Sequence, residues 1–349
     1  MPLPPRRRLP SVTRAVNLQE VRLSAAYRSR LGKAGSVLAG WARERQVCLE
    51  VAVLDPEVMT ELLISFLQDL FQLGGAHWLG LHAVLAVQTR WRHLKGKLRG
   101  AWDSVGSWDL LRPIHSRTPL PLVVLRALHR FGVLAAVALE PSLAPRWWAF
   151  AVVVQVAFFG LLRPSELWRL SRANTRVPSG RSLLAEPLAV LTIVEPKNRR
   201  FGGRLQVRAV RDRTAVAWIS WMARDLLPAD LLWPFGAGLF KTCLDQALNF
   251  LGLGHLAFTP ACFRAGGATH LFETGTSISN IRFAGSWSSE RVLSHYLQQA
   301  EAAAAVIDIP EKGAQYLEGF LAALEFAASP PALAWSELAR RWTLSAPRR

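Results

Sequence analysis

Cysteine is scarce in this sequence, and its few cysteines are far apart. The 349 residues contain three, Cys48, Cys243 and Cys262, and no CxxC pair. An odd number of widely spaced thiols indicates neither a disulfide framework nor a zinc site. Such cysteine usage is typical of a reducing compartment. We therefore expect an intracellular protein, nuclear if its source is eukaryotic, that uses no cofactor.

A long hydrophobic run and a secretory leader are also lacking. No apolar stretch follows the basic, proline-rich Met1–Pro10, so we expect no signal peptide. The longest apolar run, Trp147–Leu162, is interrupted by Gln155 and is shorter than the about 20 residues that span a bilayer. We interpret it as a buried core helix. A membrane helix is the alternative that the nearby tryptophans leave open.

Acidic residues are few relative to basic ones. Lys and Arg number 42 and Asp and Glu number 25, which gives a formal net charge of +17. This excess favours a polyanionic partner, either nucleic acid or an anionic membrane surface, over a basic surface with no specific role. Because 51% of the residues are apolar, the chain can build a sizeable core. Its length suggests two or three domains, or one large one.

Helical periodicity dominates the chain, with one β-rich interval. A helix start at Asp55-Pro56 is followed by apolar residues at helical spacing. Residues 188–194 and 204–210 are typical of a hairpin. We predict a mainly α fold with a small β-sheet (α+β). The expected parts are a basic N-terminal arm or solvated leader over 1–54, a helical domain over 55–110, a proline-rich linker over 111–121, a larger domain over 122–310 and a helical tail over 311–349.

Within this plan the pattern predicts individual helices. A short basic helix is expected to hold Arg90, Arg92, Lys95, Lys97 and Arg99, interleaved with Trp91 and Trp102. Such a stretch suits contact with DNA phosphates; a core tryptophan beside a solvated face is the alternative. The apolar face of the tail indicates packing on its own domain or on a neighbouring chain. The other predicted helices cover about 122–138, 145–160, 164–171, 213–225, 240–251, 260–274, 277–284, 289–304 and 316–328.

One arginine stands at a helix joint, in Gly160-Leu161-Leu162-Arg163-Pro164-Ser165-Glu166. Proline at the first helical position predicts that the guanidinium of Arg163 projects from a rigid helix end. Glu166 lies one turn on and is placed to orient this arginine or another group. The alternative is a surface arginine that caps a helix.

A second group of residues follows later in the chain. Arg264 precedes Gly266-Gly267, which permits a close backbone approach, and Trp287 and Tyr296 follow. A guanidinium donates paired hydrogen bonds to phosphate oxygens, and an indole N–H is a donor only. A phenol is a weak nucleophile that needs an electropositive site.

In this order and spacing, Arg163, Glu166, Arg264, Trp287 and Tyr296 resemble the catalytic box of the tyrosine recombinases, the phage-integrase family. The resemblance covers about 122–300, with 60–110 similar to the family's helical core-binding domain. The Gly-x-Trp-Ser-Ser form at 285–289 is most similar to eukaryotic integrase-like and retroelement members. The resemblance implies a DNA recombinase or integrase that cleaves and rejoins strands through a 3′-phosphotyrosyl bond, with duplex DNA as partner and self-association, a tetramer, on DNA.

The resemblance also implies a role for each residue. Arg163 and Arg264 would clamp the phosphate, Trp287 would support one of its oxygens and Tyr296 would be the nucleophile. In the hairpin turn, Lys197 would protonate the leaving 5′-oxygen, and Arg199 and Arg200 would follow the DNA backbone. A plain solvated turn lysine is the alternative for Lys197.

The sequence departs from the family at one position. Where the family commonly has a histidine three residues before the second arginine, this chain has Ala261. Loss of a proton-handling group costs about 10²–10⁴-fold in rate. The second hypothesis is therefore a decayed or domesticated member that binds DNA without efficient cleavage.

Overall fold

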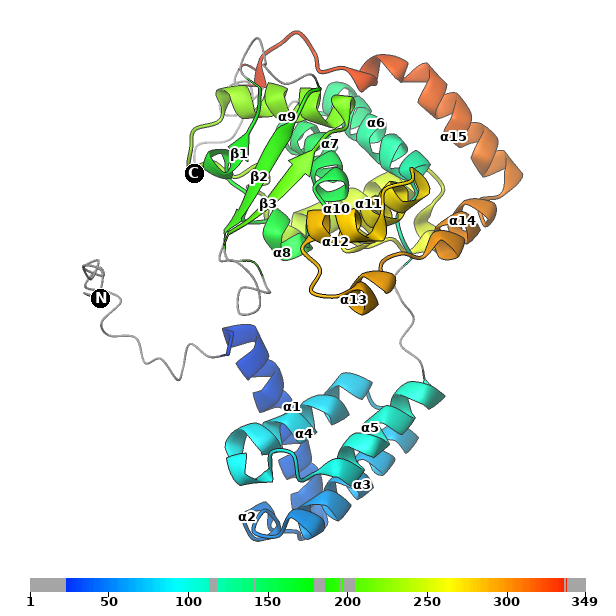
Figure 1. Cartoon of the computed structure of the whole chain (residues 1–349). Helices are drawn as coiled ribbons and strands as arrows, with labels where there is room; N and C mark the ends of the chain where they lie inside the picture. The colour runs from blue at the N-terminus through cyan, green and yellow to red at the C-terminus, as the bar shows by residue number, and fades with distance from the viewer. Residues whose placement is uncertain are drawn as a thin grey trace, which may run out of the picture. The chain divides into compact units, whose positions relative to one another are not determined.

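The structure is a computed structural model, and it describes residues 23–112, 118–140, 142–178, 186–194, 196, 205–335 and 337. The chain divides into two compact units, Met1–His115 and Ser116–Arg349. Helices form the framework of both, and the second unit adds a three-stranded antiparallel sheet (Figure 1). The predicted mainly α fold with a small β-sheet is confirmed.

The first unit is a helical bundle in which α3 follows the predicted pattern. The Asp55 carboxylate accepts a hydrogen bond from the Glu57 N–H at 2.8 Å, and Pro56 opens the helix. The helix ends before Gly74, whose φ of 70° suits glycine. The elements of this unit are α1 (Ala25–Glu44), α2 (Leu49–Ala52), α3 (Pro56–Gln72), α4 (His77–Arg90), the 3-10 turn η3 (Arg92–Leu94) and α5 (Arg99–Leu111).

Helix α1 lies in the stretch expected to form a basic arm. Ala34 and Leu38, on its buried face, belong to the same hydrophobic core as α3, α4 and α5, and α1 packs against α4. The described part of 1–54 therefore contains the helices α1 and α2, and α1 contributes to the bundle. Residues 1–22 lie outside the described residues.

The prediction of a short basic helix around 90–99 is wrong. The chain forms only the turn η3 there, and Gly96 then adopts a φ of 82°, which is incompatible with a continuing right-handed helix. Leu94 and Leu98 are fully buried and anchor the segment to the core.

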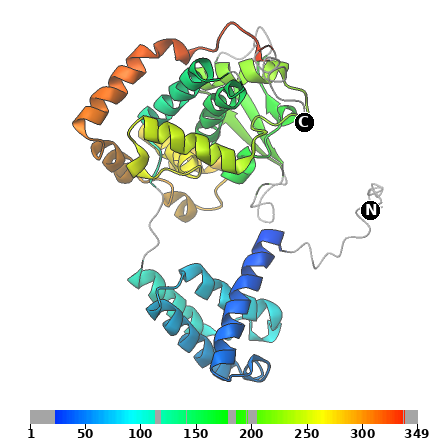
Figure 2. The same cartoon turned by 180° about the vertical axis from the view of Figure 1, so that it is seen from behind.

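Helix α7 is the centre of the second unit. Its side chains from Trp147 to Phe158 are buried. It packs against α6, α8, α9, α10 and α11, and Figure 2 shows this unit from behind. The interpretation of this run as a buried core helix is confirmed, and among the described residues no helix has the length and apolar character that crossing a membrane requires. The helices that frame it are α6 (Leu122–Ala138), α7 (Ala144–Phe159), α8 (Pro164–Leu167), α9 (Arg213–Asp225), α10 (Gly236–Phe250) and α11 (Cys262–Glu273).

Helix α8 is shorter than the helix expected over 164–171. Beyond Leu167 the backbone pairs elsewhere: the Leu232 N–H donates to the Leu170 carbonyl at 3.0 Å, and the Arg172 N–H donates to that of Asp230 at 2.8 Å. A 3-10 turn follows, η4 (Arg172–Asn174), and a second one, η5 (Gly254–Leu256), precedes α11.

The sheet contains the predicted hairpin. β2 (Ala189–Val194) pairs antiparallel with β3 (Leu205–Val210), with Leu191 opposite Arg208. A short strand, β1 (Thr175–Arg176), which the sequence did not predict, pairs with the other edge of β2. The turn that joins β2 to β3 holds Lys197, Arg199 and Arg200, which lie outside the described residues.

The helix expected over 289–304 is broken in two. α12 (Ile278–Gly285) leads to α13 (Glu290–Ser294), and α14 (Gln299–Ile307) starts only after a gap. The hydroxyl of Thr269 donates to the Tyr296 carbonyl at 3.0 Å, and the Tyr296 N–H makes a tight bond to the Leu293 carbonyl at 2.7 Å. These contacts occupy the backbone groups of Tyr296 that a continuous helix would use, so the nucleophile candidate lies at a helix end.

The C-terminal tail packs on its own unit. α15 (Glu311–Ala323) lies along α6, and η6 (Glu325–Ala328) follows (Figure 1). Four side chains of α6 and α9 hold the tail through its backbone carbonyls: Arg130 bonds Leu321, His129 faces Ala327 at 3.0 Å, Trp218 donates to Ala328 at 3.3 Å and Trp221 donates to Leu333 at 2.9 Å. The sequence left open whether the tail packs on its own domain or on a neighbouring chain. The described part of the tail packs on its own domain.

Candidate active site

Arg163 stands where α7 gives way to α8. Leu161 turns the chain with a left-handed φ of 50°, and Pro164 opens α8. The Arg163 N–H donates to Glu166 Oε2 at 2.9 Å, and its Nη1 donates to Oε1 at 2.7 Å. Glu166, whose side chain is 4% exposed, therefore orients both the backbone and the guanidinium of Arg163. This is the role that the sequence predicted for the carboxylate.

Arg264 lies one turn into α11 and is 1% exposed. Its Nη1 donates to the Leu161 carbonyl, and its Nη2 donates to the Gly285 carbonyl at 2.8 Å. Its Nη1 also lies 3.9 Å from Glu166 Oε2. Glu166 is therefore a carboxylate shared by the two arginines that the sequence singled out.

Two glycines let α11 approach the rest of the unit. A Cβ at Gly266 would lie 2.1 Å from the Leu120 carbonyl oxygen, and a Cβ at Gly267 would lie 2.1 Å from that of Phe158. Neither overlap is possible for real atoms, so both positions require glycine at this helix separation. The close backbone approach expected from the Gly266-Gly267 pair is present in the structure.

Trp287 and Tyr296 complete the cluster. The guanidinium carbon of Arg264 lies 4.2 Å from the centroid of the Trp287 ring and 5.5 Å from that of Tyr296. The two rings meet edge to face, with centroids 5.2 Å apart. Trp287 is buried and Tyr296 half-buried. The structure thus brings Arg163, Glu166, Arg264, Trp287 and Tyr296 together.

A third arginine belongs to the cluster and was missed from the sequence. Arg208, on β3, is 1% exposed; its Nη1 donates to the Ser286 hydroxyl and its Nη2 to Gln206 Oε1 at 3.0 Å. The alternation of β3 carried a signal for it. Arg208 and the buried Val210 are two residues apart and lie on the same face of the strand, whereas Leu205 and Val207 lie on the exposed face.

The cluster carries more positive than negative charge. The pKa of Arg264 is lowered to about 9, mainly by burial; Arg163 and Arg208 also act to lower it, and the Glu166 carboxylate and the Tyr296 phenol act to raise it. Burial likewise lowers the pKa of Arg208 to about 10. Among the described residues, three guanidinium groups thus face one carboxylate. Buried charge is costly unless it is compensated, so such a site favours an anionic ligand.

The buried side-chain atoms of the cluster that lack a partner are all donors. Arg208 Nε, Arg264 Nε and Trp287 Nε1 are buried and have no hydrogen-bond partner within the described protein. A phosphodiester carries only acceptor oxygens, which match this set. No group of three or more His, Cys, Asp or Glu side chains in the described part of the chain is arranged to hold a metal ion.

Alanine stands at the position that the family commonly fills with histidine, and the histidines that the sequence offers around it are described in the structure. Ala261 caps α11 and is followed one turn later by Arg264. His255 and His295 are exposed, and His270 packs against Phe158 and Phe159.

The other predicted residues lie elsewhere or are not described. Arg92, Lys95, Lys97 and Arg99 are exposed on the first unit, around η3 and the start of α5. Trp91 packs partly against the core of that unit and carries the Arg90 guanidinium 4.7 Å above its ring. The segment therefore combines both interpretations, a partly buried tryptophan and an exposed basic face. Lys197, Arg199 and Arg200 lie outside the described residues.

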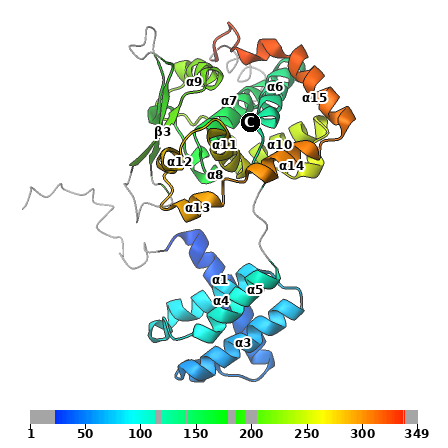
Figure 3. The same cartoon turned by 45° about the vertical axis from the view of Figure 1, so that its right-hand side comes forward.

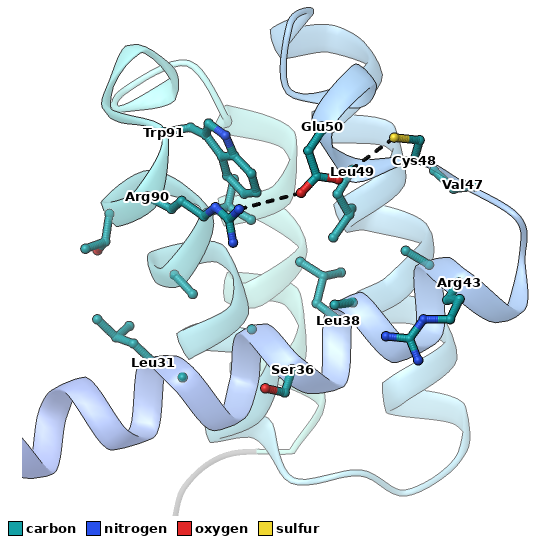
Figure 4. Close-up of a pocket in the computed structure, with 17 residues that line it drawn as sticks. Leu31, Ser36, Leu38, Arg43, Val47, Cys48, Leu49, Glu50, Arg90 and Trp91 are labelled. Carbon is teal, nitrogen blue, oxygen red and sulfur yellow. Dashed lines mark hydrogen bonds and ion pairs between the residues drawn. The ribbon is translucent and has the colours of Figure 1, made fainter.

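A cavity of about 640 Å³ opens in the first unit between α1, α2 and α4 (Figure 4). Its lining is mostly apolar, and its charged side chains include an exposed ion pair between Arg90 and Glu50 at 3.6 Å. The exposed Cys48 thiol also lines it and donates to Glu50 Oε2 at 3.9 Å. The residues that the sequence singled out for catalysis lie in the second unit.

The chain is similar to solved structures of recombinases and an integrase. The XerH site-specific recombinase bound to palindromic difH substrate in a post-cleavage complex is 15% identical, with 73% of this chain and 72% of that chain covered and a TM-score of 0.47. The Tn1549 transposon integrase in complex with circular intermediate DNA is 11% identical, with 79% and 99% covered and a TM-score of 0.49. The XerA recombinase is 15% identical, with 86% and 94% covered and a TM-score of 0.32.

These solved structures are of the class that the sequence motifs resemble. Each TM-score is below 0.5 and each identity is 15% or less, so the likenesses do not by themselves assign a function. Comparison with protein-family models gives no match, and neither does comparison with curated proteins.

Proposed function

We propose that this protein is a tyrosine recombinase that cleaves and rejoins duplex DNA, with Tyr296 as the nucleophile. The observation that carries the proposal is the meeting of two arginines on one buried carboxylate beside a tyrosine. Arg163 and Arg264 share Glu166, at 2.7 and 3.9 Å, and Arg264 lies 5.5 Å from the Tyr296 ring. A tyrosine next to excess guanidinium charge is the arrangement that phosphoryl transfer to a phenol requires.

The reaction assigns a task to each group. The Tyr296 phenol gives up its proton to water as its oxygen attacks phosphorus. A phosphotyrosyl bond forms, and the bond from phosphorus to the 5′-oxygen breaks. Arg163 and Arg264 donate to the non-bridging oxygens and stabilise the charge that grows on the five-coordinate phosphorus. Trp287 offers its unpaired indole N–H to a further oxygen. The departing 5′-oxygen takes up a proton, and Lys197 is our candidate donor. Rejoining is the reverse sequence with a new 5′-hydroxyl.

DNA binding has a basis of its own in the net charge of +17. We assign Arg92, Lys95, Lys97 and Arg99 on the first unit, with Arg199 and Arg200 in the hairpin turn, to the DNA backbone. If the protein contacts 6–10 phosphates, its affinity for duplex falls about 10³–10⁵-fold between 50 and 200 mM salt. Self-association on DNA is part of the proposal and is measured by the mass of the complex on a two-site duplex. Binding that is insensitive to salt argues against a role on DNA.

A second candidate function is DNA binding without efficient cleavage. Ala261 favours it, because the methyl group neither accepts nor donates a proton at the position one turn before Arg264. The first function is distinguished from the second only by the chemistry, since both predict the same salt-dependent binding.

Covalent trapping tests the proposal. A pool of nicked duplexes is incubated with the protein, because a short fragment beyond the nick diffuses away and leaves the adduct. We expect a complex that survives denaturation and a DNA-bearing peptide that contains Tyr296. Tyr296→Phe removes the attacking oxygen and abolishes the adduct while duplex affinity stays within about twofold. Tyr316→Phe, at a tyrosine that is 44% exposed on α15, is the matched control and keeps the adduct. An adduct that persists in Tyr296→Phe refutes the nucleophile assignment.

A further inference from the structure

Strand β3 buries polar side chains and exposes apolar ones, the reverse of an ordinary sheet strand. Its outward residues include Leu205 and Val207, which are 60% and 59% exposed, and its inward residues include Gln206 and Arg208, which are 8% and 1% exposed. Arg208 stands opposite Leu191 in the register. Burying a guanidinium on the core face of a sheet costs free energy that a hydrophobic residue would not. The position therefore calls for a reason other than packing.

Part of that reason is the turn that carries Trp287. Ser286 ends α12 with φ 51° and ψ 50°, a left-handed conformation that is uncommon outside glycine. Arg208 Nη1 donates to the Ser286 hydroxyl, and Arg264 Nη2 donates to the carbonyl of the preceding residue, Gly285. Two arginines from different elements thus hold consecutive residues of this turn. Figure 3 shows α12, which ends at this turn, beside β3.

The other part is charge. Arg208 interacts electrostatically with Glu166 and Arg163, and it lowers the pKa of Arg264. If Arg208 served only to hold Ser286, a neutral donor would do so without adding a third cation beside Arg163 and Arg264. Its Nε is unpaired, as are Arg264 Nε and Trp287 Nε1. The surplus of positive charge and of free N–H groups thus coincides at one place.

We propose that Arg208 is a third guanidinium of the phosphate site, which fixes the Gly285–Trp287 turn and adds positive charge toward the bound phosphate. The identification of the anion as a DNA phosphodiester rests on the proposed function. The presence of an anion site that includes Arg208 does not, because it follows from the buried charge and the unpaired donors.

The first experiment measures anion binding without DNA. The melting temperature of the full chain is followed as inorganic phosphate replaces chloride at constant ionic strength, for the unaltered protein, Arg208→Met, Arg208→Lys and Arg213→Met. Arg213→Met is the matched control, because it removes the same charge from an arginine that is exposed and paired with Glu186. We expect phosphate to raise the melting temperature of the unaltered protein and of Arg213→Met. The rise should vanish in Arg208→Met and persist in reduced form in Arg208→Lys. An undiminished rise in Arg208→Met overturns the proposal.

The second experiment measures the chemical step. On the nicked duplexes, Arg208→Met should slow adduct formation about 10²–10³-fold, the usual effect of losing one preorganised donor, while duplex affinity changes less than threefold. Ser286→Ala separates the two roles, because it removes the hydroxyl and keeps the cation. It should retain the response to phosphate and slow the adduct less than Arg208→Met does. Equal effects of Ser286→Ala and Arg208→Met on both readouts would reduce Arg208 to a turn clamp and overturn its role toward the anion.

The two proposals fail in different ways. If the unaltered protein forms no adduct but its response to phosphate depends on Arg208, the recombinase assignment fails and the anion site stands. If adduct forms at the same rate with and without Arg208, the recombinase assignment stands and the third guanidinium does not. Should Arg208→Met not fold, Arg208→Lys carries both measurements, and a response to phosphate and an adduct rate equal to those of the unaltered protein would count against the role of the guanidinium fork.

Discussion

The guanidinium of Arg264 lies against the face of Trp287, 4.2 Å from the ring centroid, and Trp287 in turn meets the ring of Tyr296 at 5.2 Å. Cation, indole and phenol are therefore packed in sequence, and the position of each depends on the others. The packing needs Gly285, because a Cβ there would lie 1.5 Å from Trp287 Cζ3. A residue that performs no chemistry thus determines where the indole lies.

The first prediction concerns this glycine. Gly285→Ala should displace Trp287 from Arg264, because the overlap involves a rigid ring rather than the end of a flexible chain. We expect the overpacking to destabilise the unit by about 1–3 kcal/mol and adduct formation to fall at least about 10²-fold. Gly319→Ala on α15, where a Cβ meets no atom within 4 Å, is the control and should raise the free energy of unfolding by up to about 1 kcal/mol. A Gly285→Ala protein with full activity would show that the indole position is unimportant.

The second prediction concerns the missing imidazole. Ala261 is partly exposed at the start of α11, one turn before Arg264, so a histidine fits there without entering the core. Ala261→His should raise the rate of adduct formation, by as much as about 10²-fold. Ala217→His, at an exposed position on α9, adds the same group elsewhere and should leave the rate unchanged. If only Ala261→His forms an adduct, the natural chain is a binding protein derived from a recombinase. If neither variant differs from the unaltered protein, a histidine at this position has no effect on the rate.

Local patterns in the sequence were sufficient for most of the fold. Helix α9 and the two long strands lie within one residue of the predicted ranges, because caps, alternation and apolar spacing are local signals. Arg163, Glu166, Arg264, Trp287 and Tyr296 were found from motif order, and the structure brings them together.

What the sequence missed depends on long-range contacts. The break before Tyr296 arises from the Thr269 hydroxyl, which lies on another helix and leaves no trace in the local pattern. Arg208 was overlooked because Leu205 and Val207 look like the buried face of β3. Only the distant turn at Ser286 and the charges of α8 and α11 explain why the arginine faces inward.

The third prediction concerns the tail. Leu317, Leu324, Ala327 and Trp335 belong to the hydrophobic core of the second unit, and Trp335 meets Trp221 edge to face at 5.6 Å. Deleting 311–349 should therefore destabilise the unit and impair single-site binding and assembly alike. Trp335→Ala should cost about 3–5 kcal/mol, measured by urea unfolding. A truncated protein that keeps its stability and loses only assembly on DNA would show that the tail serves a neighbouring chain.

The fourth prediction concerns pH and the anchor of that tail. His129 faces the carbonyls of Ala151 at 2.8 Å and Ala327 at 3.0 Å. Burial lowers its pKa below the usual value of about 6.5; the two carbonyls and Asp212 act to raise that pKa, and Arg130 acts to lower it. The unfolded chain therefore takes up a proton at a higher pH than the folded protein does. The stability that this site contributes is complete above about pH 6.5 and is lost as the pH falls through that value toward the folded pKa.

Urea unfolding at pH 7.5 and pH 5.5 checks this sign. The unaltered protein should lose free energy of unfolding on acidification, with a contribution from His129 of up to about 1.4 kcal/mol per pH unit. His129→Gln keeps polar atoms for the two carbonyls, but its side chain does not titrate. This variant should therefore lose less free energy of unfolding on acidification. His270, whose pKa burial also lowers, still titrates in that variant and accounts for part of the remaining loss. His255→Gln, at an exposed histidine, should behave as the unaltered protein does. An identical loss in His129→Gln would mean that His129 is not the group that couples the tail's anchor to pH.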